Sequence, residues 1–149
     1  MADNLTVYVD DLYSPTIDTL KNEGDGLFSL FIEPVVLAAI IGFSEGRKVA
    51  TSGKRREFPG SVFENNGFAS YIYLMAVADA DDPAVLKDGN EREWASVFAS
   101  YANGGFEIIS EWQEASGGAL IECLLDKMER KAMTILEKKG EDPLSIGPI

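Results

Sequence analysis

The sequence predicts a mainly α-helical fold: a single compact multi-helix domain over residues 1–139, with an extended arm at 1–13 and a flexible C-terminal tail at 140–149. Two observations support this prediction. Apolar residues recur at the three- and four-residue spacing of a helix in most segments. Proline, asparagine and glycine stand where those segments begin and end. At 149 residues, the chain is long enough to bury one sizeable core.

The N-terminal segment is the one stretch typical of a strand. Leu5 to Asp10 is rich in β-branched and aromatic residues, which predicts an edge strand or an extended arm, without an evident partner strand. Ser14-Pro15 then predicts an N-cap followed by the first residue of a short helix. This helix would bury Ile17 and Leu20 and end at Gly24-Asp25-Gly26.

The most apolar segment, Leu27 to Phe43, predicts a central helix. Pro34 suits its first turn, where the missing N–H has no helical partner in any case. Apolar residues lie almost all around the segment, which indicates a helix covered on several sides. A buried parallel strand is the alternative, but Ala38-Ala39 and the glycine-containing exit favour a helix. Gly46 is expected at the left-handed position that follows the helix.

The second half of the chain shows four more segments with helical spacing. They are Phe68 to Asp79, Glu91 to Tyr101, Phe106 to Glu114, and Ala119 to about Lys138. Before the second of them, Asp82 and Pro83 predict the cap and first residue of a one-turn helix. Phe58-Pro59-Gly60 is interpreted as a turn.

Asn103, Gly104 and Gly105 are predicted to form a structural turn between two of these helices. Asparagine and glycine tolerate positive φ, so one of the three is expected at the left-handed position that ends the first helix. A hairpin turn at Asn-Gly is the alternative. The apolar residues on both sides are spaced as in helices, which favours a corner between helices.

Composition limits the function classes. The formal net charge is -12, from 25 acidic and 13 basic residues, which disfavours nucleic-acid or anionic-membrane binding by the whole surface. The single cysteine, Cys123, excludes an intramolecular disulfide and fits a reducing cytoplasm. No targeting signal is evident, and the longest apolar run is too short to span a bilayer. We therefore expect a cytoplasmic protein with no membrane association.

We expect no enzyme, no cofactor and no metal site. The chain contains no histidine, which removes the usual general base and the commonest transition-metal ligand. No glycine-rich phosphate loop is present, and nothing selects a pair of carboxylates for hydrolysis. The acidic cluster of Asp79, Asp81, Asp82 and Asp88 lacks the spacing of a calcium loop, so a capped loop is preferred to a cation site.

Five basic residues within ten positions are the best candidate for a functional surface. They are Arg47, Lys48, Lys54, Arg55 and Arg56. Their composition predicts a loop that follows the central helix. On an acidic protein, such a cluster can meet DNA phosphates or an acidic partner. A solvated loop paired with nearby acids is the alternative without a binding role.

Four pieces of the sequence together resemble a known family. They are Leu37 to Lys48 (Leu-Ala-Ala-Ile-Ile-Gly-Phe-Ser-Glu-Gly-Arg-Lys), Val62-Phe63, Leu86-Lys87-Asp88, and Phe98 to Ile109. This arrangement resembles Dnd system-associated protein 4, a family of small accessory proteins of bacterial DNA-phosphorothioation systems, over about residues 27–121. Tyr-Ala-Asn-Gly-Gly at 101–105 is the most specific piece. The N-terminal arm and Lys54-Arg55-Arg56 depart from the pattern.

The resemblance implies an association with DNA-modification and restriction enzymes in anti-phage defence, with no catalytic residues to carry over. We therefore expect a non-catalytic accessory protein that docks on a larger protein subunit of such a system through the five basic residues. One alternative is a DNA-binding regulator that uses the same residues, for which a homodimer is an option. Another is an anionic DNA mimic that blocks a nuclease.

Overall fold

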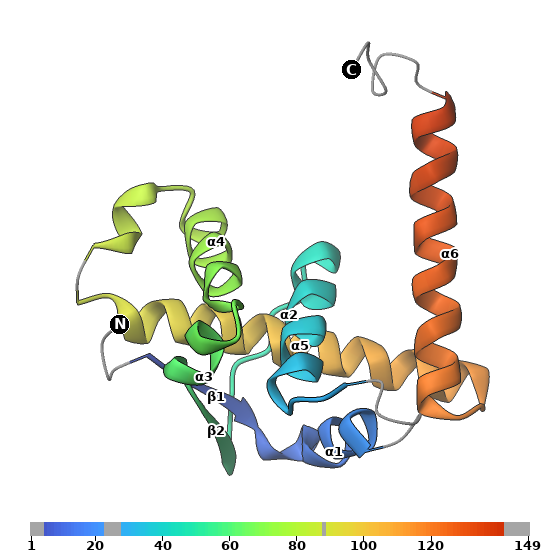
Figure 1. Cartoon of the computed structure of the whole chain (residues 1–149), viewed down its shortest axis with the longest axis horizontal. Coiled ribbons are helices and arrows are strands. Elements are labelled where there is room, and N and C mark those ends of the chain that lie inside the picture. The colour runs from blue at the N-terminus through green and yellow to red at the C-terminus, as the bar shows by residue number, and fades with distance from the viewer. Residues whose placement is uncertain (1–4, 23–27, 88, 142–149) are drawn as a thin grey trace. The chain divides into compact units, whose positions relative to one another are not determined.

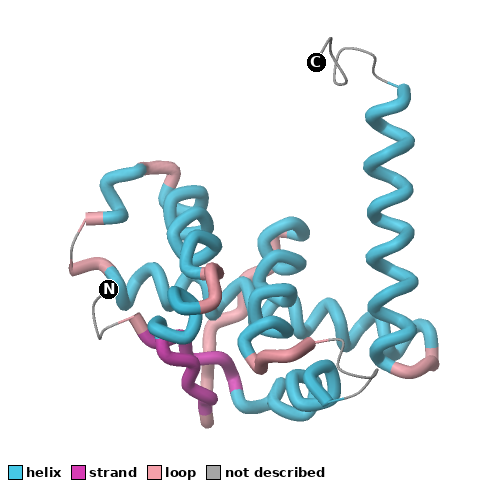
Figure 2. Tube along the Cα trace, in the orientation of Figure 1, coloured by secondary structure: helices cyan, strands magenta, loops and turns pink. Residues whose placement is uncertain are grey.

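The computed structural model describes residues 5–22, 28–87 and 89–141, and it confirms a mainly α-helical fold (Figures 1 and 2). The elements in chain order are β1 (Thr6–Asp10), η1 (Asp11–Tyr13), α1 (Ser14–Asn22), α2 (Ile32–Glu45), β2 (Arg55–Pro59), α3 (Gly60–Asn65), α4 (Ala69–Ala80), η2 (Pro83–Leu86), α5 (Glu91–Ser116) and α6 (Leu120–Glu141). Both η elements are short 3-10 helices. The chain separates into two compact units, residues 1–109 and 110–149. The single domain predicted over 1–139 remains a prediction.

The N-terminal segment is a strand with a partner. β1 pairs antiparallel with β2, in a register that runs from Thr6 opposite Pro59 to Asp10 opposite Arg55. Figure 2 shows the two strands side by side in magenta. Alternate residues Val7 and Val9 of β1 are fully buried. The strand prediction for residues 5–10 is therefore confirmed, and its missing partner is β2.

Two predictions for the segment that contains β2 are wrong. Arg55 and Arg56 lie in a strand rather than in a loop, and Phe58-Pro59-Gly60 is the junction of β2 and α3 rather than a turn. Charged residues dominate β2, and only Phe58 in it is buried, so the segment lacks the apolar alternation that identifies a strand. The pairing of β2 with β1 does not depend on these side chains, because main-chain N–H and C=O groups form its hydrogen bonds.

The predictions for α1 and α2 hold with one change. Ile17 and Leu20 are buried, as expected. The N-cap predicted at Ser14 is wrong, because Ser14 already has helical dihedral angles and is the first residue of α1. The capping carboxylate is that of Asp10, which accepts a hydrogen bond from the N–H of Leu12 and begins η1 before the helix. α2 is a helix with Pro34 in its first turn. Gly46 ends it at a φ of 68°, as predicted. The predicted stop at residues 24–26 lies outside the described residues.

The predicted turn at Asn103, Gly104 and Gly105 is also wrong. α5 runs without interruption from Glu91 to Ser116, and none of the three residues has a positive φ. All three are buried. The helical spacing on both sides of them, which predicted two helices, belongs to one helix of 26 residues.

Close contact with the backbone of neighbouring segments, rather than a turn of the chain, explains the glycines in α5. A Cβ atom on Gly105 would lie 1.7 Å from the carbonyl oxygen of Ala38 in α2. A Cβ atom on Gly42 in α2 would lie 2.0 Å from the carbonyl oxygen of Tyr101 in α5. The two helices therefore cross with their backbones in direct contact, and only glycine has room at the crossing.

Aromatic side chains fill the core of the first unit around α5. Phe63 of α3 packs edge-on against Phe98, with ring centroids 5.6 Å apart. Tyr13 of η1 stacks on Phe106, with ring centroids 5.4 Å apart. Both phenylalanines of α5 are fully buried, so this helix organises the core of the unit.

The second unit contains the end of α5 and all of α6. Gly117, at a φ of 67°, follows α5, and the long last helix is confirmed. Cys123 is buried in α6, which agrees with its interpretation as a small apolar residue. α6 reaches Glu141, two residues into the predicted tail, and residues 142–149 lie outside the described part. Among the described helices, not one combines the length and the apolar character that a membrane crossing requires.

Candidate functional site

Three of the five predicted basic residues are held in ion pairs within the first unit. The pairs join Arg47 to Glu107 at 3.1 Å, Lys48 to Asp79 at 2.7 Å, and Arg56 to Asp18 at 2.9 Å. A partner or a phosphate would have to compete with these carboxylates for the same donors. The five residues therefore do not form one uniform contact patch.

Lys48 belongs to a small network that ties α4 to α5. The same carboxylate oxygen of Asp79 accepts a hydrogen bond from Lys48 and one of 2.9 Å from the hydroxyl of Tyr101. The bond from Lys48, helped by the bond from Tyr101, lowers the pKa of Asp79, and the same contact with Asp79 raises the pKa of Lys48. Burial, and then the hydrogen bond to Asp79, raises the pKa of Tyr101. These features indicate a structural role for Lys48.

Arg56 is also structural. Its guanidinium lies 5.1 Å from the ring centroid of Phe31 and 5.4 Å from that of Phe58, in addition to its pair with Asp18. Stacking on aromatic rings and charge-assisted hydrogen bonding to a carboxylate are contacts for which a planar guanidinium is suited. Arg56 therefore fastens β2 to α1 and to the chain before α2.

Lys54 and Arg55 differ from the other three basic residues. Within residues 5–22, 28–87 and 89–141, no salt bridge engages either of them. Both are exposed, and the guanidinium of Arg55 lies 4.1 Å from the ring centroid of Tyr8 on the neighbouring strand. This stacking orders Arg55 while its N–H donors still face solvent.

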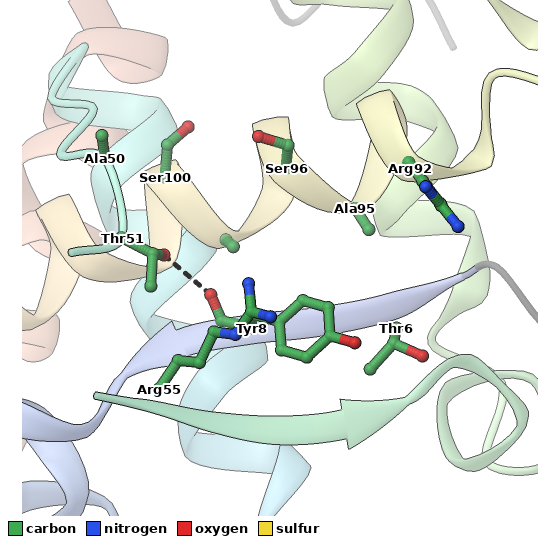
Figure 3. Close-up of a pocket in the computed structure, with 10 residues that line it drawn as sticks. Thr6, Tyr8, Ala50, Thr51, Arg55, Arg92, Ala95, Ser96 and Ser100 are labelled. Atoms are coloured by element: carbon green, nitrogen blue, oxygen red, sulfur yellow. Dashed lines mark hydrogen bonds between the residues drawn. The ribbon is translucent and has the colours of Figure 1, made fainter. Parts of the chain in front are cut away.

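Arg55 lines a pocket between β1 and α5, which we call the α5–β1 pocket (Figure 3). Its volume is about 750 Å³. The lining residues are Thr6, Tyr8, Ala50, Thr51, Arg55, Arg92, Ala95, Ser96, Ala99 and Ser100. Figure 3 shows Arg92 near the Thr6 end of the pocket and Thr51 near the opposite end.

Short side chains on one face of α5 create this pocket. Ala95, Ser96, Ala99 and Ser100 follow Arg92 at helical spacing, and all of them line the pocket. Arg92 and Tyr8 were not among the residues predicted from the sequence. A run of alanine and serine at helical spacing was the signal that could have indicated a hollow beside this helix.

Two hydroxyl groups of the pocket support its walls. Thr51 donates a hydrogen bond of 2.7 Å to the carbonyl oxygen of Tyr8, and Ser100 donates one of 2.8 Å to the carbonyl oxygen of Val97. The pocket-lining residues include two arginines and no aspartate, glutamate, lysine or histidine. Its lining is therefore cationic, and it carries no general base that titrates near neutral pH.

Asn103 fixes the wall of this pocket from inside the core. Its side chain is fully buried. The Oδ1 atom accepts a hydrogen bond of 3.1 Å from the N–H of Asp10. The Nδ2 atom donates one hydrogen bond of 3.0 Å to the carbonyl oxygen of Val49 and one of 2.8 Å to the hydroxyl of Thr51. One amide thereby joins β1 and the segment after α2 to α5. This bridging role replaces the turn predicted at Asn103.

The acidic cluster has structural roles where it is described. Asp79 belongs to the network with Lys48, Asp81 ends α4 at a φ of 54°, and Asp82 caps η2 by accepting from the N–H of Ala84. Asp88 lies outside the described residues. Across the part of the chain that the structure covers, no three or more metal-ligating side chains gather at a cation-sized site.

Comparison with known proteins places the chain in a family. The family model of DNA sulphur modification system-associated protein 4 matches residues 14–145, which is most of the chain and includes every piece that carried the resemblance. The match begins after the N-terminal arm, where the sequence departs from the expected pattern. No curated protein and no solved structure matches the chain. The chain belongs to the DNA sulphur modification system-associated protein 4 family.

Proposed function

We propose that this protein is a non-catalytic accessory component of a DNA sulphur modification system, and that it binds an acidic segment of a larger protein of that system in the α5–β1 pocket. One observation carries the proposal. Arg55 and Arg92 line the same pocket with hydroxyl side chains and without a carboxylate.

The chemistry of the pocket suits a short acidic peptide segment. An arginine offers a planar set of donors that matches a carboxylate with two parallel hydrogen bonds. The volume of about 750 Å³ lies within the range of ligand-binding pockets. Because Arg55 already stacks on Tyr8, binding costs it less conformational entropy than a mobile side chain would lose.

Charge favours a peptide over duplex DNA. The net charge of -12 opposes a polyanion, and three of the five basic residues after α2 are paired with carboxylates. Arg55, Arg92 and Lys54 provide at most three phosphate contacts. Affinity that rests on phosphate contacts falls steeply as the salt concentration rises. A concave pocket accommodates one chain segment better than the convex surface of a duplex.

The hydroxyl contacts support binding rather than catalysis. A serine or threonine nucleophile needs a neighbouring base, and the side chains that line this pocket supply none. The hydroxyls of Thr51 and Ser100 donate to backbone carbonyls instead. The whole chain has no histidine that could take the role of a base.

Binding measurements with the purified proteins of one DNA sulphur modification system test the proposal. Each larger protein is titrated with the wild type, with Arg55→Glu/Arg92→Glu, and with the control Lys87→Glu/Lys127→Glu, which changes the net charge equally outside the pocket. Each lost charged hydrogen bond costs about 1.5–3 kcal/mol, so we expect the pocket variant to bind at least about tenfold more weakly. The control is expected to bind like the wild type.

Two outcomes would overturn the proposal. One is equal affinity of the wild type and the pocket variant for every subunit. The other is binding of a DNA duplex, at near-physiological salt, that the pocket substitutions abolish and that no subunit reproduces. The second outcome would transfer the role of the arginines to the DNA-binding alternative.

A further inference from the structure

β1 borders the α5–β1 pocket with an edge whose main-chain groups β2 does not use. In an antiparallel pair, residues that exchange main-chain hydrogen bonds alternate with residues that do not. The N–H of Asp11 donates a hydrogen bond of 2.9 Å to the carbonyl oxygen of Lys54, and the bonded pairs continue from there at every second residue of the register. Thr6 and Tyr8 fall between the bonded pairs, so their main-chain groups point away from β2. Pro59, which lies opposite Thr6, has no N–H to donate, in agreement with this alternation.

Two hydrogen bonds show that this edge of β1 is turned toward α5. The N–H of Asp10 donates to Oδ1 of Asn103 in α5, and the carbonyl oxygen of Tyr8 accepts from the hydroxyl of Thr51 (Figure 3). Thr6, Tyr8 and Asp10 follow one another at every second position of the strand. Their main-chain groups therefore leave β1 on the same side, which is the side of α5.

The N–H of Tyr8 and the carbonyl oxygen of Thr6 remain without a hydrogen-bond partner on this edge. Neither group is bonded to any residue in the ranges that the structure describes. Both residues are partly exposed, and both line the pocket together with Ala95 and Ala99 of α5, whose side chains are small. Unpaired main-chain groups along the edge of a strand are a template for another extended chain.

The two arginines of the pocket stand along the same edge. The guanidinium of Arg55 lies 4.1 Å from the ring centroid of Tyr8, and Figure 3 shows Arg92 near Thr6. Because Thr6 and Tyr8 are two residues apart, their side chains share one face of β1 and are separated by about 7 Å along it. A chain extended beside β1 repeats its side-chain direction over the same distance. Acidic residues at alternate positions of that chain would each face one arginine.

We propose that the acidic segment binds in the α5–β1 pocket as a third strand on the free edge of β1, with acidic residues at alternate positions. The inference rests on the proposed function, since it specifies how the segment is held. Main-chain hydrogen bonds with the N–H of Tyr8 and the carbonyl oxygen of Thr6 supply affinity that does not depend on side chains. Arg55 and Arg92 select the spacing of the acidic residues.

Synthetic peptides and NMR of the ¹⁵N-labelled full-length chain test the strand. The probe is the acetylated and amidated pentapeptide Thr-Glu-Val-Glu-Thr, which is expected to shift the amide proton of Tyr8 downfield and to slow its exchange with solvent. One control, Thr-Glu-Glu-Val-Thr, has the same composition with adjacent acidic residues. The other control is the probe N-methylated at its three central residues, which keeps both carboxylates and loses the main-chain donors. We expect each control to bind at least about threefold more weakly than the probe.

A matched pair of protein variants tests the donor on β1. Tyr8→Pro and Tyr8→Val both lose the ring under Arg55, but only the proline variant loses the N–H. This N–H is not part of the pairing with β2, so proline removes no hydrogen bond between the strands. We expect Tyr8→Pro to bind the probe at least about threefold more weakly than Tyr8→Val. Circular dichroism establishes that both variants fold, and the peptide controls decide the question if the proline variant does not.

Several results would overturn the third strand. They are a probe that does not bind at millimolar concentration, an N-methylated peptide that binds as tightly as the probe, and a Tyr8 amide that is unchanged at saturation. Equal binding of N-acetylglutamate amide would assign the pocket to single carboxylates instead. Slower exchange of the Tyr8 amide at higher protein concentration, without peptide, would assign the edge to a second copy of the chain. The proposed function is decided separately: a subunit that binds through Arg55 and Arg92 and leaves the Tyr8 amide unprotected would support the docking site and refute the strand.

Discussion

Replacing Gly105 by alanine tests the helix crossing that positions the pocket. The added methyl carbon would lie 1.7 Å from the carbonyl oxygen of Ala38 and 2.4 Å from its carbonyl carbon. Contacts below 3.0 Å are essentially never found for such carbons, so α2 and α5 would have to separate by more than 1 Å. Because the obstructing atoms are backbone, no side-chain rotation relieves the clash.

The magnitude follows from two opposing effects. Overpacking costs about 1–3 kcal/mol, and a backbone obstruction places this site near the upper end, at about 3 kcal/mol. Alanine recovers about 1 kcal/mol over glycine within a helix. We therefore expect a net loss of about 2 kcal/mol in the free energy of unfolding, which lowers the melting temperature by about 4–8 °C for a chain of this size.

Urea unfolding followed by circular dichroism measures this loss. The control is Gly118→Ala, at a glycine without a positive φ, whose added carbon would have its nearest heavy atom 3.9 Å away. We expect the control to be as stable as the wild type or slightly more stable. A Gly105→Ala protein that matches or exceeds the stability of the wild type would refute the close backbone crossing.

Three further predictions concern side-chain contacts within the first unit. Asn103→Leu should lower the free energy of unfolding, measured in urea, by about 2 kcal/mol or more. The substitution leaves the N–H of Asp10 and the carbonyl of Val49 without their partner. A loss below about 0.5 kcal/mol would contradict the bridging role of Asn103. Because the pKa of Asp79 is lowered in the folded state, its stabilisation is present above the ordinary value of 3.8 and is lost as the pH falls through the lowered value. The stability difference between the wild type and Asp79→Asn should therefore be largest near neutral pH and disappear in acid, and an equal difference at both would count against the network with Lys48. Arg56→Gln should lower the melting temperature, because it removes the contacts with Asp18 and two aromatic rings. Arg55→Gln should change the free energy of unfolding by less than about 0.5 kcal/mol. Equal effects of the two substitutions would show that the two arginines do not divide into structural and binding roles.

Much of the fold could be predicted from the sequence because local signals agreed with the tertiary structure. Pro34 and Gly46 delimit α2, Asp82 caps η2, and Gly117 separates the last two helices, as their backbone preferences require. The strand at residues 6–10 was also recognisable from its β-branched and aromatic residues.

Asn103, Gly104 and Gly105 show where local signals were insufficient. Glycine serves both at turns and at close backbone contacts, and only the position of α2 decides between these roles. Had Gly105 been interpreted as a contact, the uniform helical spacing before and after it would have predicted one helix. The error arose because the obstructing carbonyl, that of Ala38, is far away in the sequence.

The candidate site could be predicted only in part. Arg55 was identified from its basic neighbours, yet the sequence could not separate it from Arg56, because the difference lies in contacts with Asp18 and Phe31 that are distant along the chain. Arg92 was missed because it stands alone in the sequence. Pairing of β1 with β2 and the small face of α5 bring both arginines to one pocket, and neither cause is local.

The most direct test of the central claim observes the two arginines during binding. In ¹⁵N NMR spectra, the side-chain Nε–Hε signals of Arg55 and Arg92 are followed as a purified larger subunit of the system is added, with Arg130 in α6 as the internal reference. We predict that the signals of Arg55 and Arg92 shift or broaden together, while the signal of Arg130 does not change beyond the broadening expected from the larger mass. Binding of the subunit with both pocket signals unchanged would contradict the proposal that this pocket is the docking site.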